Sequence, residues 1–118
     1  MSPRTAAGLA MRELLERSPG LEAVLAASDV MAAGTLGVLR EAGRRVPEDV
    51  ALVGVDDSVV ARLMDPPLTS VRQPVEEMGR PMTRMLLEKI TDTSGAGSVG
   101  PMEPHRSLPT ELIVRDSS

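Results

Sequence analysis

The sequence contains no cysteine, and it also contains no phenylalanine, tyrosine or tryptophan. Without cysteine the chain can form neither a disulfide nor a thiolate metal site, so its redox compartment stays undecided. Without aromatic rings the hydrophobic core must be built from Leu, Val, Ala, Ile and the eight Met residues. Because these side chains are aliphatic or flexible thioethers, we expect a soft and adaptable core.

The sequence also lacks a basic cluster and a long apolar run. Its 13 Lys and Arg are scattered and are outnumbered by 17 Asp and Glu, which gives a formal net charge of -4. A chain with this charge has no electrostatic footprint for nucleic acid. No apolar segment is long enough to cross a bilayer, and the residues after Met1 do not resemble a signal peptide. With 118 residues, we expect one cytoplasmic domain, or a piece of one, that contacts neither DNA nor a membrane.

Turn residues and apolar spacing predict alternating helices and strands in the N-terminal half. Apolar residues recur at helical spacing over 5–17, and the pattern stops at the Ser-Pro-Gly of 18–20. Continuous apolar runs at 23–27 and 50–55 predict two strands, with a helix between them that ends at Gly43. The second run is typical of a strand that is covered on both faces. A strand, helix and strand in this order predict a right-handed parallel crossover.

The C-terminal half predicts one long helix between two extended segments. The chain is extended at 68–71, and a helical pattern follows over 74–90. Pro81 lies inside this pattern and predicts a kink or a break between residues 78 and 82, because proline removes a backbone bond and crowds the preceding turn. A final short strand is expected at 111–114. The fold class is therefore α/β, with a short parallel sheet and flanking helices that leave the sheet incompletely covered.

Polar residues follow both predicted strands of the N-terminal half. Ser28 and Asp29 come directly after the first strand, and Asp56 and Asp57 come directly after the second. In open α/β sheets ligands bind beyond the carboxyl ends of the strands, so the oxygens of Ser28, Asp29 and Asp56 would converge on one rim. The same residues could instead serve as a helix N-cap and a turn, with no ligand involved. The residue pattern alone leaves both interpretations open.

The sequence offers little support for catalysis or for a bound metal. Two carboxylates could act as general acid and base, but no Ser or Cys nucleophile lies in a recognisable elbow. The single histidine, His105, is interpreted as a solvated loop residue, and the glycines of 95–98 do not lie between a strand and a helix. Asp29, Asp56 and Asp57 could hold a hard cation, although nothing requires one. We expect that the chain is not an enzyme and that it binds neither a cofactor nor a metal.

Four stretches in order resemble the C-terminal end of LacI/GalR-type bacterial transcription regulators. They are Ala23 to Gly34 (AVLAASDVMAAG), Val46 to Asp57 (VPEDVALVGVDD), Pro66 to Gly79 (PPLTSVRQPVEEMG) and Leu108 to Ser117 (LPTELIVRDS). The resemblance implies a partial periplasmic-binding-protein-like fold, in which an effector binds between two α/β lobes. It assigns 1–67 to the C-terminal lobe, 68–110 to a crossover and the last helix of the N-terminal lobe, and 111–118 to a return strand and tail. The DNA-binding domain and most of the N-terminal lobe would be absent.

The resemblance also implies a function for the whole protein, which is that of a dimeric repressor that senses a small sugar or nucleoside. Operator DNA would be bound only through the absent N-terminal helix-turn-helix. Ser28, Asp29 and Asp56 match family positions that contact the effector or brace its pocket. The homodimer interface would include Met31, Thr35 and Leu63.

Two positions depart from the family pattern. Val55 stands where the family usually has Phe or Tyr, so any stacking on a sugar would come from the missing lobe. Pro81 stands where the family usually has a small helix former. Since the helix over 74–90 would lack its partner lobe, we expect the fragment to dimerise through that surface or to leave the helix loosely ordered. Two alternatives remain: a sugar-binding protein that serves a membrane permease, and a stand-alone module that pairs with regulator dimers.

Overall fold

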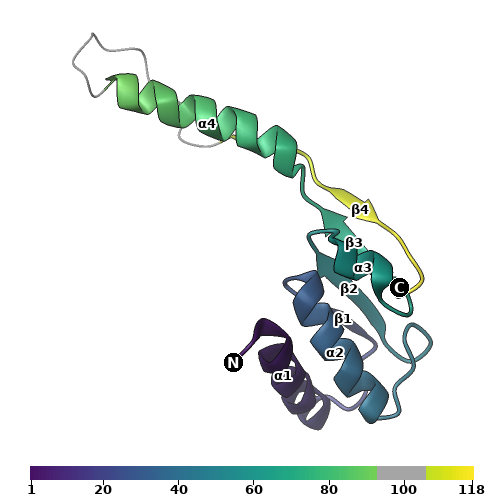
Figure 1. Ribbon diagram of the computed structural model, residues 1–118. Coiled ribbons are helices and arrows are strands. Elements are labelled where there is room, and N and C mark those ends of the chain that lie inside the picture. Colours follow the sequence, from purple (N-terminus) through teal and green to yellow (C-terminus); the bar gives the residue numbers. More distant parts are fainter. Residues whose placement is uncertain (93–105) are drawn as a thin grey trace. The chain divides into compact units, whose positions relative to one another are not determined.

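The computed structural model describes residues 1–92 and 106–118 (Figure 1). His105 and the glycines of 95–98 lie outside these described residues. Contacts divide the chain into two compact units, and the first unit comprises 1–73 together with 111–118. The second unit comprises 74–110. None of the helices in the described part of the chain is long and apolar enough to cross a membrane.

The first unit is built on a four-stranded sheet in the order β1-β2-β3-β4. The strands are β1 (Ala23–Leu25), β2 (Ala51–Val55), β3 (Thr69–Arg72) and β4 (Glu111–Ile113). The first three strands are parallel, with Leu25 opposite Val53 and Val53 opposite Thr69. β4 pairs with β3 in the antiparallel direction. The expected α/β class with a short parallel sheet is confirmed, and the antiparallel β4 shows that the chain reverses direction before it returns to this sheet.

Three helices accompany the sheet: α1 (Pro3–Arg17), α2 (Asp29–Glu41) and α3 (Val59–Leu63). α1 begins at Pro3, two residues before the expected range, because Ser2 Oγ accepts a hydrogen bond from Thr5 N at 3.2 Å and Pro3 suits the first turn. α1 packs along α2 (Figure 1). A Cβ at Gly34 would overlap the carbonyl oxygen of Arg4, so the close approach of the two helices requires glycine at this position.

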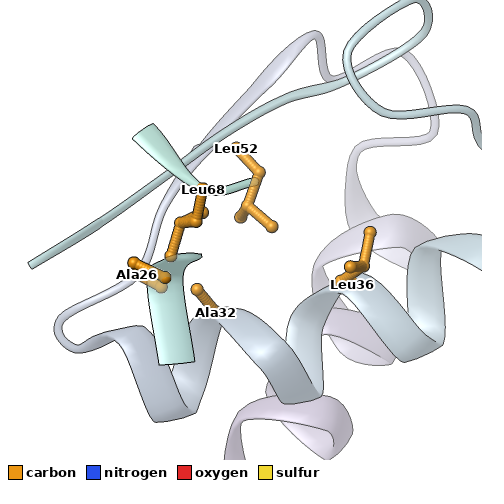
Figure 2. Close-up of a cluster of buried hydrophobic side chains, with 6 residues drawn as sticks. Ala26, Ala32, Leu36, Leu52 and Leu68 are labelled. Carbon is orange, nitrogen blue, oxygen red and sulfur yellow. The ribbon is translucent and has the colours of Figure 1, made fainter. Parts of the chain in front are cut away.

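The core consists of two clusters of buried aliphatic side chains. The first joins α2, α3 and the sheet, and Figure 2 labels five of its six residues; it comprises Ala26, Ala32, Leu36, Leu52, Ala61 and Leu68. The second joins α1, α2 and the start of β2, and it comprises Met11, Val38, Leu39 and Val50. Each fully buried Leu or Met contributes about 1.5–3 kcal/mol from the loss of contact with water. Met11 and Leu39 therefore hold α1 against α2 without any aromatic residue.

Ser117, near the end of the sequence, is hydrogen-bonded to two neighbouring strands of the sheet. The Ser117 hydroxyl donates to Leu52 O at 2.6 Å and accepts from Thr69 N at 2.8 Å. The backbone carbonyl of Ser117 also accepts from Leu52 N at 2.8 Å. Ser117 is fully buried and joins β2 to β3 through its side chain and its backbone.

Among its described residues, the second unit contains the helix α4 (Val75–Asp92). The helix continues through Pro81, so of the kink or break that the sequence predicts, the break is wrong and the kink stays a prediction. Proline removes the hydrogen bond to the carbonyl of Glu77, and Glu77 is exposed, so water can satisfy that group. Several large apolar side chains of α4 are exposed, namely Val75, Met82, Leu86, Leu87 and Ile90.

Candidate functional site

The candidate site lies at the carboxyl ends of β1 and β2. Because these strands are parallel neighbours, the residues that follow them meet at the same edge of the sheet. A bond from Ser58 N to Asp29 Oδ2, 2.7 Å long, joins the segment after β2 to the segment after β1. The structure thus brings Ser28, Asp29 and Asp56 to one rim, as the sequence predicts, but their local environments differ.

Ser28 acts as the N-cap of α2. Its Oγ accepts a hydrogen bond from Met31 N at 3.2 Å, and its backbone is extended. This bond satisfies one of the free N–H groups of the first helical turn. Ser28 is half-buried, so the residue is partly accessible to solvent. The capping interpretation is therefore realised, while an effector contact by Ser28 stays a prediction.

Asp29 is buried, with 1% of its surface exposed, and both of its oxygens accept bonds from this chain. Oδ2 accepts from Ser58 N at 2.7 Å and from Ser58 Oγ at 2.8 Å, while Oδ1 accepts from Ser70 Oγ at 2.7 Å. Asp29 thereby caps the start of α3, whose own N-cap residue makes no side-chain capping bond. These bonds compensate for removing the carboxylate from water. Its role as an effector ligand stays a prediction, and the structure shows a bracing role.

Gly54 makes the burial of Asp29 possible. A Cβ at this position would lie 2.6 Å from Asp29 Oδ1 and 2.7 Å from Leu68 Cδ2. Real Cβ atoms do not approach other atoms this closely, so a larger residue would push one of these groups away. The glycine in β2 therefore provides the space in which the Asp29 carboxylate reaches Ser70.

Asp57 is held by arginines, which the sequence did not single out. Arg115 Nη2 lies 2.6 Å from Oδ1, and Arg72 Nε lies 2.8 Å from Oδ2, while only 1% of the Asp57 side chain is exposed. Arg62 is more distant, at 3.9 Å. Burial raises the pKa of Asp57, but the hydrogen bonds from Arg115 and Arg72 outweigh it, so the net pKa is lowered. The sequence gives no sign of these pairs, because Arg72 and Arg115 lie 15 and 58 residues away along the chain.

Asp56 differs from its neighbours because it is exposed and its backbone has a φ of 115°. This region is unfavourable for residues with a side chain and is concentrated at functional sites, at a cost of about 1–3 kcal/mol. The Asp56 N–H donates to Val71 O at 2.9 Å, which fixes the backbone. Within residues 1–92 and 106–118, no hydrogen bond or ion pair engages its carboxylate. Of the three carboxylates at the rim, Asp56 is the one with oxygens available to a ligand.

The three residues expected at a dimer interface lie in different environments. Leu63 is 79% exposed at the end of α3. Met31 is half-buried against the first core cluster. Thr35 is 4% exposed, and its hydroxyl donates to Met31 O at 3.0 Å, so it has little surface to offer a partner. The interface stays a prediction for all three residues.

Among the described residues, no group of three His, Cys, Asp or Glu is arranged to hold a metal ion. Asp29 accepts bonds from Ser58 and Ser70, and Asp57 pairs with Arg115 and Arg72. The rim therefore has the chemistry of a hydrogen-bond acceptor site, in which Asp56 is the carboxylate without a partner among the described residues.

Comparison with known proteins identifies relatives over nearly the whole chain. The family model of the periplasmic binding protein-like domain matches residues 2–118. The HTH-type transcriptional regulator CelR of Thermobifida fusca is 55% identical over 109 residues, which are 92% of this chain and 30% of that protein. The Ribose operon repressor of Halalkalibacterium halodurans is 34% identical over 108 residues, covering 91% of this chain and 30% of that protein.

A solved structure agrees with these relatives. The structure of a complex of the transcriptional regulator CelR with cellobiose is 52% identical and superposes with a TM-score of 0.83. The match covers 98% of this chain and 33% of that one. The chain therefore spans about a third of the length of the proteins that it matches.

Proposed function

We propose that this chain, which belongs to the LacI family of regulators with a periplasmic binding protein-like domain, is the effector-sensing and dimerising part of a transcriptional repressor. One observation carries the proposal: an exposed carboxylate, Asp56, stands at the carboxyl end of β2 with a strained backbone and no partner within the described residues. In α/β folds this edge of the sheet is where ligands bind. The buried neighbours Asp29 and Asp57 brace the rim around it.

We propose a sugar as the effector, and more specifically a disaccharide of the cellobiose type. A carboxylate accepts hydrogen bonds from hydroxyl groups, which sugars and nucleosides provide, and it repels phosphates and acids. Among these classes a disaccharide is supported by the 52% identity to a regulator solved with cellobiose. Since this chain has no Phe, Tyr or Trp, any ring that stacks on the sugar must come from residues outside it.

We further propose that the whole protein is a cytoplasmic homodimer that binds operator DNA through a helix-turn-helix outside this chain. The net charge of -4 favours a part that senses the effector rather than one that contacts DNA. The two lobes can be more open or more closed, and an effector that binds one of these states more tightly increases the population of that state. The change in population alters the affinity of the two DNA-binding domains of the dimer for the operator. The proposed role is binding, not catalysis. It takes precedence over the transport alternative because the relatives compared above are regulators.

The proposal is tested by calorimetry on the protein at its natural length, titrated with cellobiose, lactose, ribose and a nucleoside. Asp56→Asn should weaken sugar binding about 10–100-fold, as expected when a bond to a charged acceptor is lost. Asp49→Asn is the matched control, because Asp49 precedes β2 at the opposite end of the strand from the rim. Equal affinities for Asp56→Asn and the unaltered protein, or no binding of any of the four ligands, would contradict the proposal.

The intact mass of the native polypeptide tests the remaining alternative. A product much longer than 118 residues supports the regulator, because relatives are about three times as long as the matched segment. A product of about this length would favour the stand-alone module that pairs with regulator dimers.

A further inference from the structure

The strands β3 and β4, which lead to and from the second unit, are both held by arginines that bind the buried carboxylate of Asp57. The chain leaves the first unit after Gln73 and returns to it at Glu111. Arg72 is the last residue of β3, directly before the outgoing connection, and Arg115 lies two residues beyond the end of β4, the strand with which the chain returns. Both arginines bind Asp57.

We propose that Asp57 is a positioning residue, which ties both connecting strands and the backbone of Asp56 into one rigid element so that events at the rim reach both strands. This inference rests on the proposed function, since it assigns Asp56 to the effector. It assigns no ligand contact to Asp57 itself, because only 1% of that side chain is exposed.

We call the cluster of Asp57, Arg72 and Arg115 the anchor. Each oxygen of the Asp57 carboxylate binds the arginine of a different strand segment. Oδ1 is 2.6 Å from Arg115 Nη2, and Oδ2 is 2.8 Å from both Nε and Nη2 of Arg72. Arg115 is the more enclosed of the two, with 17% of its side chain exposed, and its Nη1 also donates to Leu68 O at 2.8 Å. Neither strand can shift relative to the end of β2 without breaking charge-assisted bonds.

The anchor also controls the backbone that carries Asp56. Asp57 has a φ of 51°, and its N–H donates to Ser70 Oγ at 2.9 Å. Ser70 in turn donates to Asp29, which accepts from Ser58, so Asp57 and Asp29 belong to one connected set of bonds. Two successive residues with positive φ persist only where surrounding bonds hold them. If the Asp57 charge is lost, the constraint on Asp56 and the constraint on the two strands are released together.

Hydrogen exchange on the protein at its natural length tests the anchor without any effector. Asp57→Asn keeps the shape of the side chain and removes its charge. We expect the amides of β3 and β4 to exchange at least about tenfold faster, while the amides of Leu36 and Leu39 in α2 are unchanged. Arg115→Met should reproduce this pattern, and Arg115→Lys should restore part of the protection because it keeps the charge. Arg12→Met is the matched control, since Arg12 pairs with Glu41 on the surface, with 57% of its side chain exposed.

Effector binding provides the second measurement. In Asp57→Asn the affinity for cellobiose and the effect of cellobiose on operator affinity should both fall by about tenfold, within the usual range of coupling between sites. A purely structural role predicts a uniform acceleration of exchange over the first unit, and that result overturns the proposal. Unchanged cellobiose affinity with locally faster exchange overturns it as well. If the unaltered protein binds no sugar, the proposed function fails, while exchange in Asp57→Asn still decides whether the anchor exists.

Discussion

Replacing Gly54 by alanine should destabilise the protein strongly, although it adds only one methyl group. The added Cβ would lie 2.6 Å from Asp29 Oδ1 and 2.7 Å from Leu68 Cδ2, and both neighbours are buried. Overpacking of this kind costs about 1–3 kcal/mol. Displacing Asp29 also weakens its bonds to Ser58 and Ser70, and bonds to charged groups contribute about 1.5–3 kcal/mol. Because Asp29 can keep some of these bonds, we expect the free energy of unfolding to fall by about 3 kcal/mol.

The measurement is urea denaturation followed by circular dichroism, with Gly37→Ala as the control. Gly37 lies in α2 with no atom within 4 Å of a Cβ added there, so alanine should raise the free energy of unfolding by about 0.5–1 kcal/mol. With a urea m-value of about 2 kcal/mol per molar, Gly54→Ala should lower the midpoint by roughly 1.5 M. A Gly54→Ala midpoint equal to that of the unaltered protein would refute the steric argument.

Three further predictions concern charges and the dimer. The pKa of Asp49 should be about 2, lowered mainly by the side-chain hydrogen bond from Arg45, and an NMR titration of Arg45→Met should return it toward 3.8. Because the pKa of Asp57 is lowered in the folded state, its contribution to stability is present above pH 3.8 and is lost as the pH falls through the folded value. The free energy of unfolding should therefore depend less on pH in this acidic range in Asp57→Asn, and an equal dependence would argue against the pairing. Leu63→Asp should shift the protein from dimer to monomer in light scattering, and an unchanged mass would remove Leu63 from the interface.

The sequence alone was sufficient to locate the rim, because parallel strands end at the same edge and Ser28, Asp29 and Asp56 each follow such a strand. It could not distinguish the carboxylates from one another. Asp29 is satisfied by Ser58 and Ser70, which lie 29 and 41 residues away in the chain. Only the folded structure brings these partners together, so it alone shows that Asp56 remains available.

The fold was predictable where the apolar pattern is long and was missed where it is short. The strands and the two long helices of the first unit agree with the expected ranges to within about three residues, as is usual for element ends. α3 was missed because five residues are too few to show helical spacing. The continuity of α4 through Pro81 does not follow from the sequence, because the local cost of proline depends on whether water can reach the residue four positions earlier, and only the structure shows that Glu77 is exposed.

The burial of Ser117 has a consequence for biosynthesis. The hydroxyl and the carbonyl group of Ser117 form hydrogen bonds with Leu52 and Thr69. Both of these residues leave the ribosome well before Ser117. While 74–110 is being translated, the backbone groups of Leu52 and Thr69 therefore lack the partner that Ser117 provides. Incompletely folded chains with unpaired strand groups are prone to aggregate. Translation that pauses within 74–110 should therefore increase aggregation.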